Sequence, residues 1–122
     1  MKQQKFSILN RFKSFKYAFN GIKILLKEEH NARIHFFALI LVVIAGAIFK
    51  ISLPEWISII IVSGIVISAE IFNSAIENIA DFISPEKNDQ IKRIKDLAAA
   101  AVLFGSSVAI IVGLLIFIPN IF

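Results

Sequence analysis

The 122-residue sequence contains no cysteine, which excludes disulfide bonds and thiol chemistry. Charge is also scarce: 18% of the residues are charged and 57% are apolar, whereas soluble domains average about 25% and 45–50%. The apolar residues gather in long blocks instead of spreading along the chain. This distribution favours a protein that lies in a bilayer over one that folds around a globular core.

The signatures of soluble nucleotide-binding and zinc enzymes are missing too. There is no GxxxxGKS/T, GxGxxG, HRD, DFG or HExxH motif, so any phosphoryl transfer must use another scaffold. His30 and His35 are therefore better explained as interfacial polar residues than as a zinc-type pair. No secretory signal peptide is visible, because the first apolar block follows many charges. We expect that block to remain in the mature protein.

Three apolar blocks cover residues 34–51, 56–83 and 97–118, and a spanning helix needs roughly 17–25 residues. Pro54 and Pro85 follow the first and second blocks, where proline predicts a break between helices. Ahead of the blocks, residues 7–29 carry apolar side chains at three- and four-residue steps with lysines opposite, which predicts an amphipathic interfacial helix. We predict an all-α membrane protein, a single domain over residues 1–122, with three transmembrane helices behind this interfacial helix. The helix could act as a simple membrane anchor or cover a lipid site.

Lysine and arginine placement predicts the topology. Twelve of the 13 lie before the first span or in the 84–96 loop, and only Lys50 lies between the first two spans. The positive-inside rule then puts the N-terminus and the 84–96 loop in the cytoplasm. We expect the C-terminus on the opposite side of the membrane. The net charge is +4, and the basic residues flank the apolar blocks. The expected partner is therefore the membrane surface and not nucleic acid.

One face of the second span carries an unusual polar stripe, formed by Glu70, Asn73, Glu77 and Asp81. Inserting each ionisable group near the bilayer centre costs about 2.5–3.5 kcal/mol or more. This cost favours a functional site over a structural seam, meaning a row of hydrogen bonds that only joins helices. Glu70 and Glu77 lie about 10.5 Å apart along the axis, too far to share one metal ion easily. Glu77 is nearer the cytoplasm, within reach of Mg²⁺ and phosphates. Glu70 lies at the depth of a lipid hydroxyl, where a carboxylate suits a general base.

Two charged clusters lie on the same predicted side of the membrane as the polar stripe. Glu29 precedes the first span as a candidate second metal carboxylate, and Lys95 opens the third as a candidate phosphate-binding cation.

The third span carries a stripe of small residues. They recur every four positions and allow close helix approach, at Ala101, Gly105, Ala109 and Gly113. Because three spans cannot enclose a reaction site, we expect a homo-oligomer; packing within one protomer is the alternative use of the stripe.

Residues 69–103 (AEIFNSAIENIADFISPEKNDQIKRIKDLAAAAVL) resemble the signature of the prokaryotic diacylglycerol kinase and undecaprenol kinase family. That signature is Glu-x-x-Asn-Ser/Thr-Ala-Ile-Glu, then an Asp, a loop and Lys-Asp. The matching residues here are Glu70, Asn73, Ser74, Ala75, Ile76, Glu77, Asp81, Lys95 and Asp96. The likeness extends over nearly the whole chain.

The resemblance implies a homotrimer with sites between protomers, which uses Mg²⁺ and ATP to phosphorylate a membrane lipid alcohol. It also implies a bacterial inner-membrane location with the active site on the cytoplasmic side. By position, Glu70 resembles the catalytic base, and Glu29 and Glu77 resemble the metal-binding carboxylates that also contact ATP. The family often has an arginine near position 10; this chain has Asn10, and Arg11 is the neighbouring candidate. The other implied nucleotide contacts are Tyr17, Asn73, Glu86, Lys87, Asn88, Asp89, Gln90, Lys95 and Asp96.

The implied lipid contacts are Asn31, Arg33 and His35, together with Glu70. The 31–35 segment is similar to the undecaprenol branch, whereas diacylglycerol enzymes tend to carry an acidic residue at position 35. This favours undecaprenol as the substrate.

Two other functional classes remain open on the residues alone. A small proton- or cation-coupled transporter would use Glu70 and Glu77 as a relay, but would leave Lys95, Asp96 and the amphipathic helix without a role. A non-catalytic helper subunit would use the polar stripe for assembly. ATP hydrolysis that depends on a lipid alcohol would separate a kinase from both.

Overall fold

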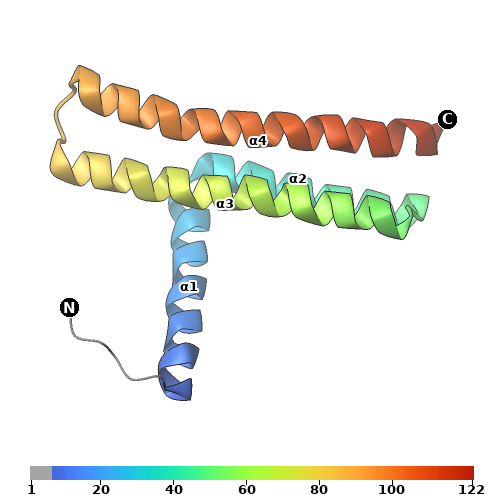
Figure 1. Ribbon diagram of the computed structural model, residues 1–122, viewed down its shortest axis with the longest axis horizontal. Coiled ribbons are helices and arrows are strands. Elements are labelled where there is room, and N and C mark those ends of the chain that lie inside the picture. Colours follow the sequence, from blue (N-terminus) through green and yellow to red (C-terminus); the bar gives the residue numbers. More distant parts are fainter. Residues whose placement is uncertain (1–6) are drawn as a thin grey trace.

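The computed structural model describes residues 7–122, which form four helices and, within that range, no strand. These are α1 (Ile8–Glu28), α2 (His30–Phe49), α3 (Leu53–Ile83) and α4 (Asp89–Ile121). The last three run side by side, and α1 points away across their direction (Figure 1). All three are long and apolar enough to cross a membrane, which confirms the predicted all-α, three-span fold.

Local signals in the sequence explain where α3 and α4 begin. The Ser52 hydroxyl accepts from the Glu55 amide, while the Glu55 carboxylate accepts from the Ser52 amide at 2.9 Å, so the pair forms a capping box. Pro54 stands in the same first turn, where it removes no helical hydrogen bond. Asn88 caps α4, because its Oδ1 accepts from the Ile91 amide at 2.8 Å.

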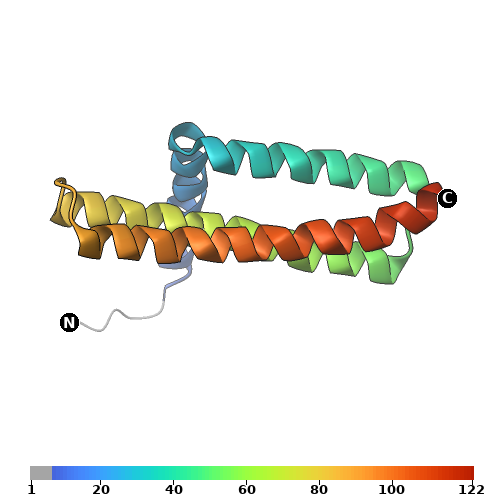
Figure 2. The same ribbon diagram turned by 90° about the horizontal axis from the view of Figure 1, so that it is seen from above.

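The helices differ in length, and the difference sets the shape of the site. With 31 and 33 residues, α3 and α4 are about 46 and 50 Å long, against about 30 Å of hydrocarbon core. The 20-residue α2 is about 30 Å long. A short turn joins α2 to α3, so these two share one end, and at the other end α3 and α4 continue beyond the start of α2 (Figure 2). The 84–88 connection therefore projects past the level at which α1 branches off.

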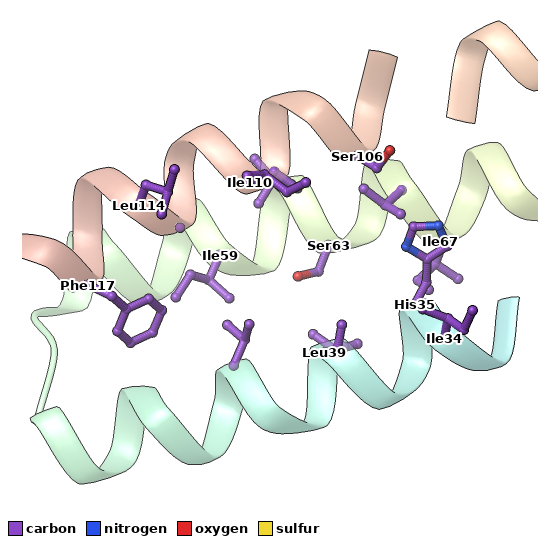
Figure 3. Close-up of a pocket in the computed structure, with 16 residues that line it drawn as sticks. Ile34, His35, Leu39, Ile59, Ser63, Ile67, Ser106, Ile110, Leu114 and Phe117 are labelled. Carbon is purple, nitrogen blue, oxygen red and sulfur yellow. The ribbon is translucent and has the colours of Figure 1, made fainter. Parts of the chain in front are cut away.

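Packing among the three long helices is uneven. α3 lies closely along α4, whereas α2 contacts α3 far less. A buried cluster of Ile51, Ile59 and Ile116 joins them near the C-terminal end, with Trp56 and Phe117 packed against it. Away from this cluster an apolar groove of about 480 Å³ stays open, lined by side chains of α2, α3 and α4 (Figure 3).

Of the small residues along α4, some contribute to packing between helices of the same protomer. A Cβ at Gly105 would lie 3.6 Å from Ile65 of α3, so this glycine belongs to the α3–α4 contact. Gly113 has nothing within 4 Å of such a position and lines the groove together with Ala109. The α3–α4 packing therefore uses one member of the stripe, and any role in oligomerisation stays a prediction.

The helix predicted for residues 7–29 is present as α1, and most of its surface is exposed. Leu25 is its only buried residue, next to the junction with α2. Apolar side chains near its start, such as Phe12, Phe15 and Phe19, are exposed, as are its lysines. Its position in a membrane interface stays a prediction.

Candidate active site

At the end of the groove that lies away from the α2–α3 turn, two ionisable side chains from different helices approach each other. His35 of α2 lines the groove, and its Nε2 lies 3.0 Å from Oε1 of Glu70 on α3. Glu70 keeps only 2% of its side chain exposed. The contact is close but lacks the alignment of a hydrogen bond, so this oxygen has no hydrogen-bond donor within residues 7–122. The imidazole is therefore the side chain of α2 that approaches the buried carboxylate.

A second contact lies one helical turn farther along α3, toward the 84–88 connection. Ser74 donates its hydroxyl hydrogen to Oε1 of Glu29 at 3.2 Å, and Asn78 donates to the Ser74 carbonyl at 2.9 Å. Glu29 is the residue between α1 and α2, so this bond ties their junction to α3. Glu29 is near enough to interact electrostatically with both Glu70 and Glu77. The three carboxylates thus form one acidic region along the polar stripe.

This acidic region fits Mg²⁺ better than a transition metal. No three His, Cys, Asp or Glu side chains converge on one metal position within the described residues. Mg²⁺ usually takes only one or two protein carboxylates and completes its shell with waters and phosphate oxygens. Glu29 and Glu77 match that requirement, because both lie toward the open, loop-side end of the stripe.

A polar cradle of about 570 Å³ lies beyond this region, where α3 ends and α4 begins. Two ion pairs border it: Lys95 Nζ to Asp81 Oδ1 and Lys92 Nζ to Asp96 Oδ2, both at 2.6 Å. The predicted nucleotide contacts that line the cradle are Glu86, Lys87, Asn88, Asp89, Lys95 and Asp96. Gln90 is exposed and is not part of the lining. Six sequence-predicted residues therefore share one hollow.

Other predicted residues lie apart from the cradle. Tyr17 and Arg11 are exposed on α1, about 18 and 27 Å along its axis from Glu29. Asn31 is exposed, and Arg33 donates to the Lys27 carbonyl at 3.2 Å, which supports the α1–α2 junction. One protomer therefore brings neither α1 residue to the loop.

Asn73 lies on α3 between Glu70 and Glu77, and its Oδ1 is buried without a hydrogen-bond donor in the described chain. Buried polar atoms without a partner are uncommon in native proteins. This one lies where a nucleotide contact was predicted.

Two contacts were missed from the sequence. The pairing of His35 with Glu70 and the bond from Ser74 to Glu29 both join different helices, and spacing within one helix does not reveal such neighbours. Lys92 was also missed, although its four-residue distance from Asp96 was a usable signal, because such pairs face each other on a helix.

Comparison with known proteins gives consistent matches. A family model described as prokaryotic diacylglycerol kinase matches residues 16–117. An undecaprenol kinase from Bacillus subtilis is 39% identical over 113 residues, which cover 92% of each chain. A diacylglycerol kinase from Synechocystis sp. is 30% identical over 90% of this chain and 63% of its own length. Another diacylglycerol kinase, from Helicobacter pylori, is 36% identical over 77% of this chain and 73% of its own.

Proposed function

We propose a reaction for this chain from its membership of the prokaryotic diacylglycerol kinase family, which makes it a multi-pass membrane lipid kinase. In this reaction the γ-phosphoryl group of ATP is transferred to the hydroxyl of a membrane lipid alcohol. Membership confirms the resemblance carried by the motif from Glu70 to Asp96. One observation supports the proposed reaction above all. The apolar groove ends at His35, whose Nε2 lies 3.0 Å from the buried Glu70 carboxylate, and a polar cradle lies beyond that carboxylate in the same direction.

The groove suits the hydrocarbon part of the lipid. It extends from His35 to Phe117, toward the α2–α3 turn (Figure 3). A lipid with its hydroxyl beside Glu70 would point its chain along this groove into the bilayer. Binding sites for small apolar ligands combine such an apolar lining with a few polar groups that fix orientation.

The acidic region and the cradle suit Mg-ATP. Glu29 and Glu77 would hold Mg²⁺, which neutralises phosphate charge when bound. Lys95 lies at the cradle border, where its ammonium would contact phosphate oxygens after exchanging its contact with Asp81. Glu70 lies two turns deeper than Glu77 and would face the lipid hydroxyl. The residues then align nucleotide and lipid, which is most of what phosphoryl transfer requires from a protein.

A homotrimer is the proposed assembly, with each site shared between protomers. Tyr17 and Arg11 lie far from the cradle of their own protomer, so they could contact nucleotide only in a neighbour. Many large apolar side chains of α2, α3 and α4 are exposed, which leaves surface both for lipid and for other protomers.

Undecaprenol is the proposed lipid, in keeping with the name of the Bacillus subtilis relative. The test supplies purified protein in detergent micelles with Mg²⁺, labelled ATP, and undecaprenol and diacylglycerol side by side. We expect label in undecaprenyl phosphate at the higher rate. Faster labelling of diacylglycerol would overturn the substrate, and label in neither lipid would overturn ATP-dependent transfer.

The proposed location is the bacterial inner membrane with the site in the cytoplasm, because 12 of the 13 lysines and arginines lie in residues 1–33 or 84–96. Reporter fusions inserted at Asn88 are expected to read cytoplasmic, and fusions after Phe122 are expected to read extracytoplasmic. An extracytoplasmic signal at Asn88 would contradict this orientation.

A further inference from the structure

Lys92 is a cradle residue to which the proposed reaction gives no role. It lines the cradle from the start of α4, on the same helix as Lys95. Its Nζ lies 2.6 Å from Oδ2 of Asp96, and its side chain is 75% exposed. The ammonium group is therefore held beside the cradle and remains accessible to a ligand that enters it.

The position of this lysine is unfavourable for the helix itself. α4 begins at Asp89, so Lys92 is its fourth residue, near the positive end of the helix dipole, where a carboxylate is stabilising and a cation is not. Pairs four residues apart also stabilise a helix more when the carboxylate comes first, and here the lysine comes first. An ion pair this exposed adds little to stability. Helix formation alone therefore does not account for Lys92.

Three charged side chains follow one another from the polar stripe into the cradle. Glu77, the proposed metal carboxylate, is near enough to Lys95 to interact with it electrostatically. Lys92 lies three residues before Lys95, about 4.5 Å nearer the start of α4, and residues three apart share one face of a helix. Lys95 therefore lies between the metal carboxylate and Lys92 along the direction of α4.

We infer that Lys92 binds the α- and β-phosphates of the nucleotide after exchanging Asp96 for phosphate oxygens. This inference rests on the proposed kinase reaction and deepens it. The γ-phosphoryl group must lie toward Glu70 and the lipid hydroxyl, so Glu77 and Lys95 are next to it and Lys92 is farther along the phosphate chain. Lysine suits this role because its ammonium is a compact charge on a flexible stem.

The exchange of partners costs little for this lysine. Both members of the pair are mostly exposed, with 75% of the Lys92 side chain and 63% of the Asp96 side chain accessible, so water and salt already weaken their attraction. Phosphate oxygens form strong charge-assisted hydrogen bonds with an ammonium group. Once Lys92 has moved, the Asp96 carboxylate, itself a predicted nucleotide contact, is released to accept a hydrogen bond from the same ligand.

The rival explanation is that Lys92 only neutralises Asp96. Loss of the lysine would then leave an unbalanced negative charge in the cradle and weaken nucleotide binding indirectly. The two explanations differ in an Asp96→Asn background, where no negative charge is left at this position to neutralise. A direct phosphate contact would still be lost in that background, whereas an indirect effect would disappear.

The test uses the full-length protein in micelles, with Mg²⁺, ATP and the lipid alcohol for turnover and with ADP for direct binding. ADP lacks the γ-phosphate, so its affinity reports on the α- and β-phosphates. Lys92→Gln is expected to raise the KM for ATP and to weaken ADP binding by about tenfold each, the effect of losing one hydrogen bond to a charged group. The kcat at saturating ATP should not change, because a contact made equally in the ground and transition states affects KM alone.

Two further variants serve as controls. Lys92→Arg keeps the charge and should keep most of the affinity. Arg93→Gln makes the same change in net charge as Lys92→Gln at the neighbouring position, which does not line the cradle; its KM for ATP and its ADP affinity should equal those of the wild type.

Four results would overturn the inference. They are a KM for ATP and an ADP affinity for Lys92→Gln within about twofold of those for Arg93→Gln, a fall in kcat with an unchanged KM, a raised KM for ATP with full ADP affinity, or an effect that disappears in the Asp96→Asn background. In each case the proposed function would stand as long as the wild type phosphorylates lipid with ATP. If the wild type phosphorylates no lipid alcohol, the proposed function itself fails, whatever the result at Lys92.

Discussion

Replacing Glu70 by glutamine is expected to lower lipid phosphorylation by about 10²–10⁴-fold, the usual effect of losing a general base, with ATP binding largely kept. Glu70 lies about 10 Å farther from the 84–88 connection along α3 than Glu77, at the level proposed for the lipid hydroxyl. Glutamine has nearly the same shape but cannot accept the proton. A large loss of turnover is therefore expected.

The measurement pairs lipid phosphorylation with ATP affinity on the same purified variant, with oligomer size checked. Glu55→Gln is a matched control on the same helix, because glutamine also satisfies a capping box; its rate should equal that of the wild type. A Glu70→Gln variant that assembles, binds ATP and phosphorylates lipid near the wild-type rate would remove Glu70 from the chemistry. A variant that fails to assemble would favour the alternative in which the polar stripe only joins helices.

The helices could be predicted from the sequence, because the signals that set their spans and ends are local. Long apolar blocks need no knowledge of neighbours to be interpreted as spans, and Pro54 and Pro85 mark helix boundaries through backbone chemistry alone. The direction of α1, across the other three helices, had no such local signal (Figure 1). It depends on the single-residue junction at Glu29 and its bond to Ser74.

Within the site, the sequence predicted separations along one helix better than contacts between helices. Glu70 and Glu77 share one helix, so their separation follows from the helical rise. The contact between His35 and Glu70 depends on the register of α2 against α3, which residue spacing does not encode. The groove was not foreseen either, because it results from the uneven packing of α2.

Replacing Glu77 or Glu29 by glutamine is expected to raise the Mg²⁺ concentration needed for half-maximal activity by at least about 10–100-fold, since even supporting residues of metal sites have effects of that size. Glutamine keeps an oxygen but removes the negative charge, and hard cations such as Mg²⁺ bind preferentially to charged carboxylates and phosphates. Both side chains lie toward the loop-side end of the stripe, near the cradle. Neither variant should lose its membrane insertion, because the apolar spans are unchanged.

Mg²⁺ and ATP titrations on the purified variants test this assignment. Glu28→Gln is the matched control, because Glu28 is exposed beside Glu29 and makes the same change in net charge; its Mg²⁺ dependence should equal that of the wild type. Glu29 also accepts a hydrogen bond from Ser74, so Ser74→Ala should shift the Mg²⁺ dependence in the same direction but less. Wild-type Mg²⁺ and ATP dependence in both carboxylate variants would show that the metal is held elsewhere. A shift in Glu77→Gln alone would leave Glu29 with a structural role at the α1–α2 junction, because only Glu77 would then act on the nucleotide side.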